Sequence, residues 1–169
     1  NITVIKFPKI CEISTGIYWI SMCLFTVISL VLMGTSGSHT LMSMLNSYTI
    51  YNVTYGQAFY IMMFAGYIAN LLATTISMLL SAVMGSPNIA ICIPFFLFCI
   101  MPFAGRLGGE KGIFLLTPDQ LNNFQEIMKV NHIFQIGGFV TNQLDLLLMV
   151  YVIVNVILIP LIYFVYKKK

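Results

Sequence analysis

Long stretches without a single charged residue constrain this chain more than any other feature of its sequence. Four such stretches cover residues 13–33, 56–84, 89–104 and 146–166. A helix that crosses the hydrocarbon core of a bilayer needs about 20 apolar residues, and three of the stretches are long enough. The stretch 89–104 is shorter and contains Pro94 and Pro102, so it is either a short or bent span or a re-entrant element. We count it as a span.

Composition supports an integral membrane protein. Hydrophobic residues make up 59% of the chain and charged residues 8%, against roughly 45–50% and about 25% in soluble domains. The apolar stretches show no alternation of polarity of the kind that marks a transmembrane β-barrel. We therefore predict an all-α, polytopic transmembrane helix bundle, with a single transmembrane domain over residues 1–169.

Basic residues at both ends of the chain predict its orientation. Lys167, Lys168 and Lys169 follow the last stretch, and Lys6 and Lys9 precede the first. Lysine and arginine gather on the cytoplasmic side of membrane proteins. Four spans return a chain to its starting side, so we predict a multi-pass protein of the plasma membrane with both termini cytoplasmic.

A polar segment between the last two stretches, TPDQLNNFQEIMK, has a helix-start signal. Thr117 is a suitable N-cap for Gln120, and Pro118 suits the first helical position. An external amphipathic helix is therefore expected over about 118–130, too short and too polar to span. Such a helix suits the bilayer surface or the sides of the spans, either as an ordinary capped helix in a loop or as a lid. Its apolar stripe comprises Leu121, Phe124, Ile127 and Met128.

Small residues recur at every fourth position of the second stretch. Because lipid supplies no hydrophobic drive between helices, rows of small residues that allow close backbone approach favour association. This helix is therefore expected to be central in the bundle. The row comprises Ala65, Ala69, Ala73, Ser77, Ser81 and Gly85.

Asn70 and Asn155 lie deep in their stretches, where an unpartnered amide is costly. Two interpretations stay open for them and for Thr74. These side chains either form hydrogen bonds between helices or line a substrate path.

Several classes of protein lack support. The spans contain no Asp, Glu, Lys, Arg or His, which argues against a proton-coupled transporter. A nucleotide-binding phosphate loop and an H-E-x-x-H metal motif are both missing, and no basic stripe suits nucleic acid. We therefore expect no enzyme activity, no bound cofactor or metal in this chain, and no nucleic-acid partner.

Two segments resemble the membrane subunit of bacterial ABC-2 type exporters. The segment SYTIYNVTYGQAFYIMMFAGYIANLLATTISMLLSAVMGSPNIAICIPFFLF is similar to the middle of such permeases, with a polar approach, a span ending in LSA, an SP turn and a following span. The tail LLLMVYVIVNVILIPLIYFVYKKK is similar to their last span. Family members usually have six spans, so the resemblance implies that this chain is the C-terminal four-span portion of a longer permease; its start at Asn1 rather than Met fits that expectation.

The resemblance also implies partners. A separate cytoplasmic ATPase subunit would bind ATP and supply energy, and a second permease half, identical or different, would complete the path in the membrane lipid. Position alone places Asn70, Thr74 and Asn155 on the path and residues 118–130 in an external lid. Lys6, Lys9 and Glu12 would lie nearest the ATPase.

Two alternatives stay open. The first is a noncatalytic membrane protein, such as an immunity or scaffold protein, that acts through helix–helix contacts. The second is a membrane-embedded transferase or lipid-modifying enzyme, for which Asp145 alone is weak support.

Overall fold

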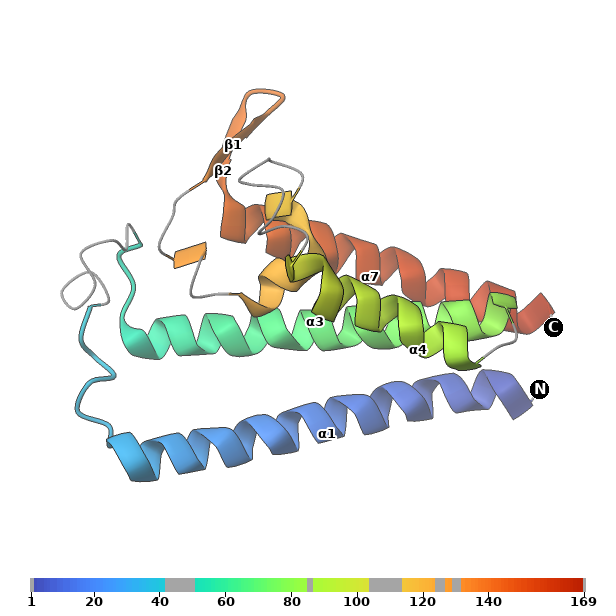
Figure 1. The fold of residues 1–169 in the computed structure, drawn as a ribbon, viewed down its shortest axis with the longest axis horizontal. Helices are drawn as coiled ribbons and strands as arrows, with labels where there is room; N and C mark the ends of the chain where they lie inside the picture. The colour runs from blue at the N-terminus through green and yellow to red at the C-terminus, as the bar shows by residue number, and fades with distance from the viewer. Residues whose placement is uncertain are drawn as a thin grey trace.

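The computed structural model describes residues 2–41, 51–84, 87–103, 114–123, 127–128 and 132–168, and it is mostly helical. Three long helices, α1 (Ile2–Met33), α3 (Tyr55–Met84) and α7 (Gln143–Lys168), lie side by side with α3 in the middle (Figure 1). Each contains a stretch that is long and apolar enough to cross a membrane. Three of the four predicted spans are thus present, and both chain ends lie at the same end of the bundle (Figure 1).

The fourth predicted span, 89–104, is a shorter apolar helix. It starts as α4 (Pro87–Phe95), turns into a π-helix, η1 (Phe96–Ile100), and continues to Phe103. Pro94 lies inside α4 and has no N–H to donate. The Met101 N–H donates to the Phe96 carbonyl, five residues back, as in a π-turn. This helix runs back beside α3 and covers only part of its length (Figure 1).

The segment between α4 and α7 corrects two expectations. An all-α fold was predicted, yet β1 (Ile133–Ile136) pairs with β2 (Phe139–Asn142) in an antiparallel hairpin. The sequence IFQIGGFVTN does carry this signal, because two apolar runs flank a Gly-Gly turn. Gly137 and Gly138 have φ values of 55° and 92°, which glycine adopts readily.

The predicted helix over 118–130 is not continuous. Residues 114–116 form η2 (Phe114–Leu116), and η3 (Pro118–Asn122) is a short 3-10 helix that ends at Asn123. Thr117 forms no side-chain cap; its carbonyl accepts the Gln120 N–H instead. Two adjacent asparagines favour a helix end because their side chains compete for backbone hydrogen bonds.

The core lies where α3, α7 and the η3 segment meet. Leu147 and Ile162 of α7 are completely buried, and α3 packs most extensively against α7. Leu121 of η3 and the neighbouring Ile127 and Met128 share this core, so these members of the predicted stripe lie against the spans. Among the described residues, the buried members of this cluster are Ala58, Ala65, Ile68, Ala69, Leu121, Ile127, Met128, Leu144 and Leu147.

The row of small residues on α3 does not face one neighbour. A step of four residues turns an α-helix about 40° past a full turn, so the row winds slowly around the helix. Ala65 and Ala69 are buried in the core, whereas Ala73 and Ser77 are half-buried beside α4. Ser81 is also half-buried, and Gly85 lies outside the described residues. α3 contacts α1, α4, η3 and α7 and is the central helix, as expected.

Candidate functional site

Polar side chains join α1 to α3 near the middle of both helices. The Ser14 Oγ and Thr74 Oγ1 atoms are 3.0 Å apart, and the Asn70 Nδ2 donates to Ser14 Oγ at 3.2 Å. Thr74 Oγ1 also donates to the Asn70 carbonyl one turn earlier. The structure therefore brings together two of the three predicted path residues, with Ser14 as a partner that the sequence did not indicate.

Asn155, the third predicted path residue, lies on another side of α3. Its side chain is 6% exposed, and its Oδ1 accepts from Thr75 Oγ1 at 3.3 Å. Its Nδ2 donates to the carbonyls of Tyr151, at 2.9 Å, and Ile68, at 3.5 Å. The bonds to Thr75 and Ile68 join α7 to α3, whereas the bond to Tyr151 lies within α7.

Tyr18 forms a second contact between α1 and α3. Its hydroxyl donates to the Met63 carbonyl at 2.6 Å. The contact depends on Gly66, because a Cβ at that position would lie 2.7 Å from the Tyr18 hydroxyl oxygen. The Tyr18 ring also packs against the rings of Trp19 and Tyr67. A glycine in α3 therefore makes room for an aromatic anchor from α1.

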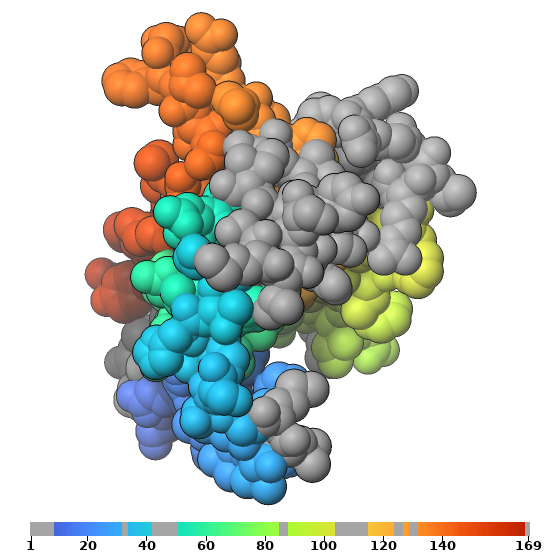
Figure 2. Space-filling model, turned by 90° about the vertical axis from the view of Figure 1, so that its left-hand side faces the viewer, coloured from blue at the N-terminus to red at the C-terminus, as the bar shows by residue number. Residues whose placement is uncertain are grey.

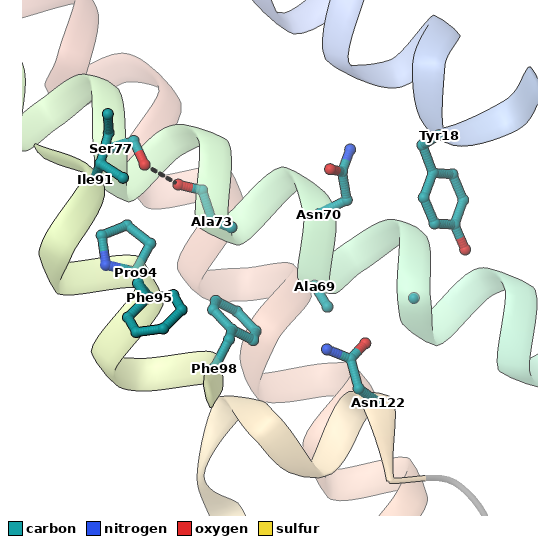
Figure 3. Close-up of a pocket in the computed structure, with 11 residues that line it drawn as sticks. Tyr18, Ala69, Asn70, Ala73, Ser77, Ile91, Pro94, Phe95, Phe98 and Asn122 are labelled. Atoms are coloured by element: carbon teal, nitrogen blue, oxygen red, sulfur yellow. Dashed lines mark hydrogen bonds between the residues drawn. The ribbon is translucent and has the colours of Figure 1, made fainter. Parts of the chain in front are cut away.

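A cavity of about 490 Å³ lies between α1, α3, α4 and η3. Figure 3 shows Tyr18 of α1 above α3, with α4 and η3 on the other side. The described residues around it include no charged side chain; they are apolar, aromatic, hydroxyl or amide. Its walls are formed by Tyr18, Gly66, Ala69, Asn70, Ala73, Ser77, Ile91, Pro94, Phe95, Phe98 and Asn122.

A second cavity of about 390 Å³ lies beside the first, along one face of α1. Ser14 and Ser21 contribute hydroxyls to it, and isoleucines of α1 form much of the rest. Tyr18 and Asn70 line both cavities. These two side chains therefore stand at the boundary between the two spaces, and their movement would change both.

A further polar cluster ties the segment before η3 to the start of α7. Tyr151 Oη donates to the Leu116 carbonyl at 2.7 Å, and Gln143 Nε2 donates to the Leu115 carbonyl at 2.8 Å. Asp119 is buried nearby and accepts from its neighbour Gln120. These bonds fix η2 and η3 against α7, which holds Asn122 at the cavity.

Tyr51 lies at the same end of the bundle, before α3. Burial raises the pKa of its hydroxyl, and the Asp145 carboxylate adds to that effect. Tyr51 packs against the core beside its partly buried neighbours. The hydroxyl therefore stays neutral at physiological pH and contributes no charge to this end of the molecule.

The remaining predicted residues are placed as follows. Lys9 and Glu12 are exposed on the first turns of α1, at the end of the bundle where the C-terminus lies (Figure 1). Lys6 belongs to the same helix, but its side chain lies outside the described residues, as does Phe124. The described part of the chain has no cluster of three His, Cys, Asp or Glu side chains suited to a metal ion.

Sequence reasoning missed Ser14, Tyr18 and Asn122. A signal for the first two was present, because Ser14 and Tyr18 are one helical turn apart and share a face of α1. Asn122 lies in the segment for which the sequence predicts an external amphipathic helix. Its position at the cavity depends on the fold of the segment between α4 and α7, for which the sequence offered no comparable signal.

No family model matches this chain, and no curated protein or solved structure matches it significantly. The resemblance to ABC-2 permeases therefore stays a prediction from the residues themselves.

Proposed function

We propose that this chain is the membrane-spanning permease part of an ATP-driven exporter of the ABC-2 type. In this proposal the chain crosses the plasma membrane several times with both termini cytoplasmic. A separate ATPase subunit supplies energy, and a second permease half, of the same or a different kind, completes the path. The chain itself contributes a path and carries out no covalent chemistry.

The observation that carries the proposal is the uncharged cavity between α1, α3 and α4. It lies beside α1 and α3, which are long and apolar enough to cross a membrane, and the shorter apolar α4 forms another wall. Polar groups such as Asn70, Ser77 and Asn122 line it. A space with both hydrogen-bonding and apolar walls suits a solute that must pass through hydrocarbon surroundings. If these helices only packed against one another, their side chains would be expected to fill the space between them.

The chemistry of the walls also indicates a class of substrate. Phe95, Phe98 and Tyr18 offer aromatic surface, and Asn70 and Asn122 offer amides that both donate and accept. A charged group would lack a counter-ion among the described lining residues, and burying it would be costly. We therefore propose a neutral, amphiphilic substrate with an apolar body and a few hydrogen-bonding groups.

Two measurements test this function. Purification in mild detergent, followed by identification of bound proteins, should recover an ATPase with a phosphate loop. The chain could instead be recovered without any ATPase and still protect cells fully in a cell-protection assay. That result would favour the alternative of a noncatalytic immunity or scaffold protein.

Efflux measurements then test the path. Asn70→Leu is expected to reduce export severalfold while the chain still folds, because it removes the amide that borders both cavities. Asn88→Leu is the matched control, since Asn88 is exposed on α4 and does not line either cavity. Unchanged export by Asn70→Leu would remove this cavity from the path.

A further inference from the structure

The hairpin formed by β1 and β2 exposes apolar side chains along its length and at its tip. Phe139 is 81% exposed, and Ile133, Ile136 and Val140 are more than half exposed. Residues 130–144 contain no Asp, Glu, Lys or Arg. Exposed strand edges in water usually carry charges, lysine above all, and a lone hairpin is marginally stable there. This hairpin is therefore poorly suited to an aqueous loop.

The register of the hairpin puts apolar side chains on both of its faces. Ile136 pairs with Phe139, and Gln135 pairs with Val140. Because side chains alternate along a strand, Ile136 and Phe139 lie on one face, whereas Val140 lies on the other. A flat partner surface would cover one face only. A medium that surrounds the tip would contact both.

The position of the hairpin along the bundle follows from α7, which begins directly after β2. Asp145 and Lys167 bound the apolar part of α7 and are 22 positions apart (167 − 145). At about 1.5 Å per residue that stretch is about 33 Å long, close to the roughly 30 Å of a hydrocarbon core. If Lys167 lies at one membrane boundary, the base of the hairpin lies at the other.

The hairpin also points in a suitable direction. In Figure 1 it projects crosswise to the long helices rather than continuing along α7. Figure 2, viewed along the long axis of the molecule, shows the same segment extending beyond the helices on one side. A hairpin that leaves the bundle crosswise at the membrane boundary runs along the bilayer surface.

We propose that this hairpin is an interfacial membrane anchor, with the tip around Phe139 inserted at the boundary between lipid headgroups and acyl chains. The unpaired backbone groups at its strand edges need water, which the headgroup region supplies and the hydrocarbon core does not. The apolar tip and the polar edges therefore both have suitable surroundings at this depth. The inference depends on the membrane insertion of the bundle and is independent of transport.

Tryptophan fluorescence in lipid nanodiscs tests the anchor. Trp19 is the only tryptophan of the chain, so Trp19→Phe combined with Phe139→Trp places a single reporter at the tip. Its emission should shift to shorter wavelength than in unfolded chain, and phosphatidylcholine brominated near the headgroup end of its acyl chains should quench it. Iodide in the buffer should quench it weakly.

The matched control is Trp19→Phe combined with His39→Trp. His39 is exposed in the polar loop after α1, and a tryptophan there should be quenched by iodide and not by the brominated lipid. The wild-type chain, with Trp19 in α1, reports on insertion of the bundle itself. If lipid brominated deep in its acyl chains does not quench the Trp19 fluorescence, the bundle is not inserted.

Two results at the tip would overturn the proposal while Trp19 still reports insertion. Strong iodide quenching at position 139 would place the tip in water. A short-wavelength emission that neither iodide nor brominated lipid quenches would place it against protein, such as a second copy of the chain.

Discussion

The contact of α3 with α7 and its contact with α1 differ in kind. α7 presents large apolar side chains to α3 and the η3 segment, and Leu144, Leu147 and Ile162 are buried there. α1 presents Ser14 and Tyr18 to α3, joined by hydrogen bonds and bordered by two cavities. One interface is filled and the other is partly open.

This difference indicates which part of the molecule is suited to move. In lipid, helices associate through close packing and hydrogen bonds rather than through a hydrophobic drive. Separating α7 from α3 would break dense packing and the bonds of Asn155 to Thr75 and Ile68. Separating α1 from α3 breaks a few hydrogen bonds of half-buried groups. We therefore expect α3, α7 and η3 to act as one body against which α1 shifts.

The largest expected effect tests the filled interface. Leu147→Ala removes a completely buried side chain and should lower the free energy of unfolding by about 2–5 kcal/mol. The surrounding side chains are packed, so they fill only part of the space that the leucine leaves. Leu161→Ala on the same helix is the matched control, since Leu161 is 41% exposed. This substitution should lower the free energy of unfolding much less. Denaturant titrations in lipid bicelles measure both. Equal losses would mean that α7 is not packed as described.

The second prediction compares Asn155 with Asn70, and the expected loss of stability is smaller. Asn155→Leu breaks two hydrogen bonds between α7 and α3 and one within α7, and it should lower the free energy of unfolding by about 1 kcal/mol, the usual size for polar contacts between membrane helices. Asn70→Leu should cost less, because Asn70 is only half-buried. The same bicelle titrations compare the two variants. A larger loss for Asn70→Leu would reverse the assignment of the rigid and movable parts.

The sequence was sufficient for the parts of the fold that depend on lipid. Apolar length predicted α1, α3 and α7, because the bilayer requires it whatever the tertiary contacts. Pro94 likewise indicated that the stretch 89–104 would be short or bent. The Gly137–Gly138 turn signal was also present in the sequence, but no strands were predicted there.

The site depended on contacts that no local pattern contains. Asn70, Thr74 and Asn155 are all polar residues inside apolar stretches, and the rotation of each helix decides which ones meet. The prediction of a shared path did not distinguish the α1 side of α3 from the α7 side. Asn122 reaches the cavity through η3, whose placement depends on the hydrogen bonds of Gln143 and Tyr151.

A third prediction concerns the room that Gly66 provides for Tyr18. Gly66→Ala places a methyl group 2.7 Å from the Tyr18 hydroxyl oxygen, so the tyrosine must leave the Met63 carbonyl. The lost contact, about 1 kcal/mol, is offset by the better helix propensity of alanine, also about 1 kcal/mol. The free energy of unfolding should therefore change little, while the contact between α1 and α3 becomes looser.

Cysteine cross-linking measures that loosening. Cysteines placed at Ser14 and Thr74 in a background free of other cysteines should form a disulfide several times more slowly in the Gly66→Ala variant. Gly16→Ala is the control on α1, because a Cβ there meets no described atom within 4 Å. An unchanged rate in Gly66→Ala would mean that Tyr18 does not hold the two helices together.

A fourth prediction isolates the hydroxyl of that tyrosine. Tyr18→Phe keeps the ring and removes only the bond to the Met63 carbonyl, so the free energy of unfolding should fall by about 0.5–1 kcal/mol. In a Gly66→Ala background the same change should have almost no effect, because the bond is already broken, and contacts that share one partner do not add. Unfolding titrations of the two single variants and the double variant measure this coupling. Additive losses would show that Tyr18 keeps its bond to the Met63 carbonyl beside an alanine at position 66, so that Gly66 would not be needed for this contact.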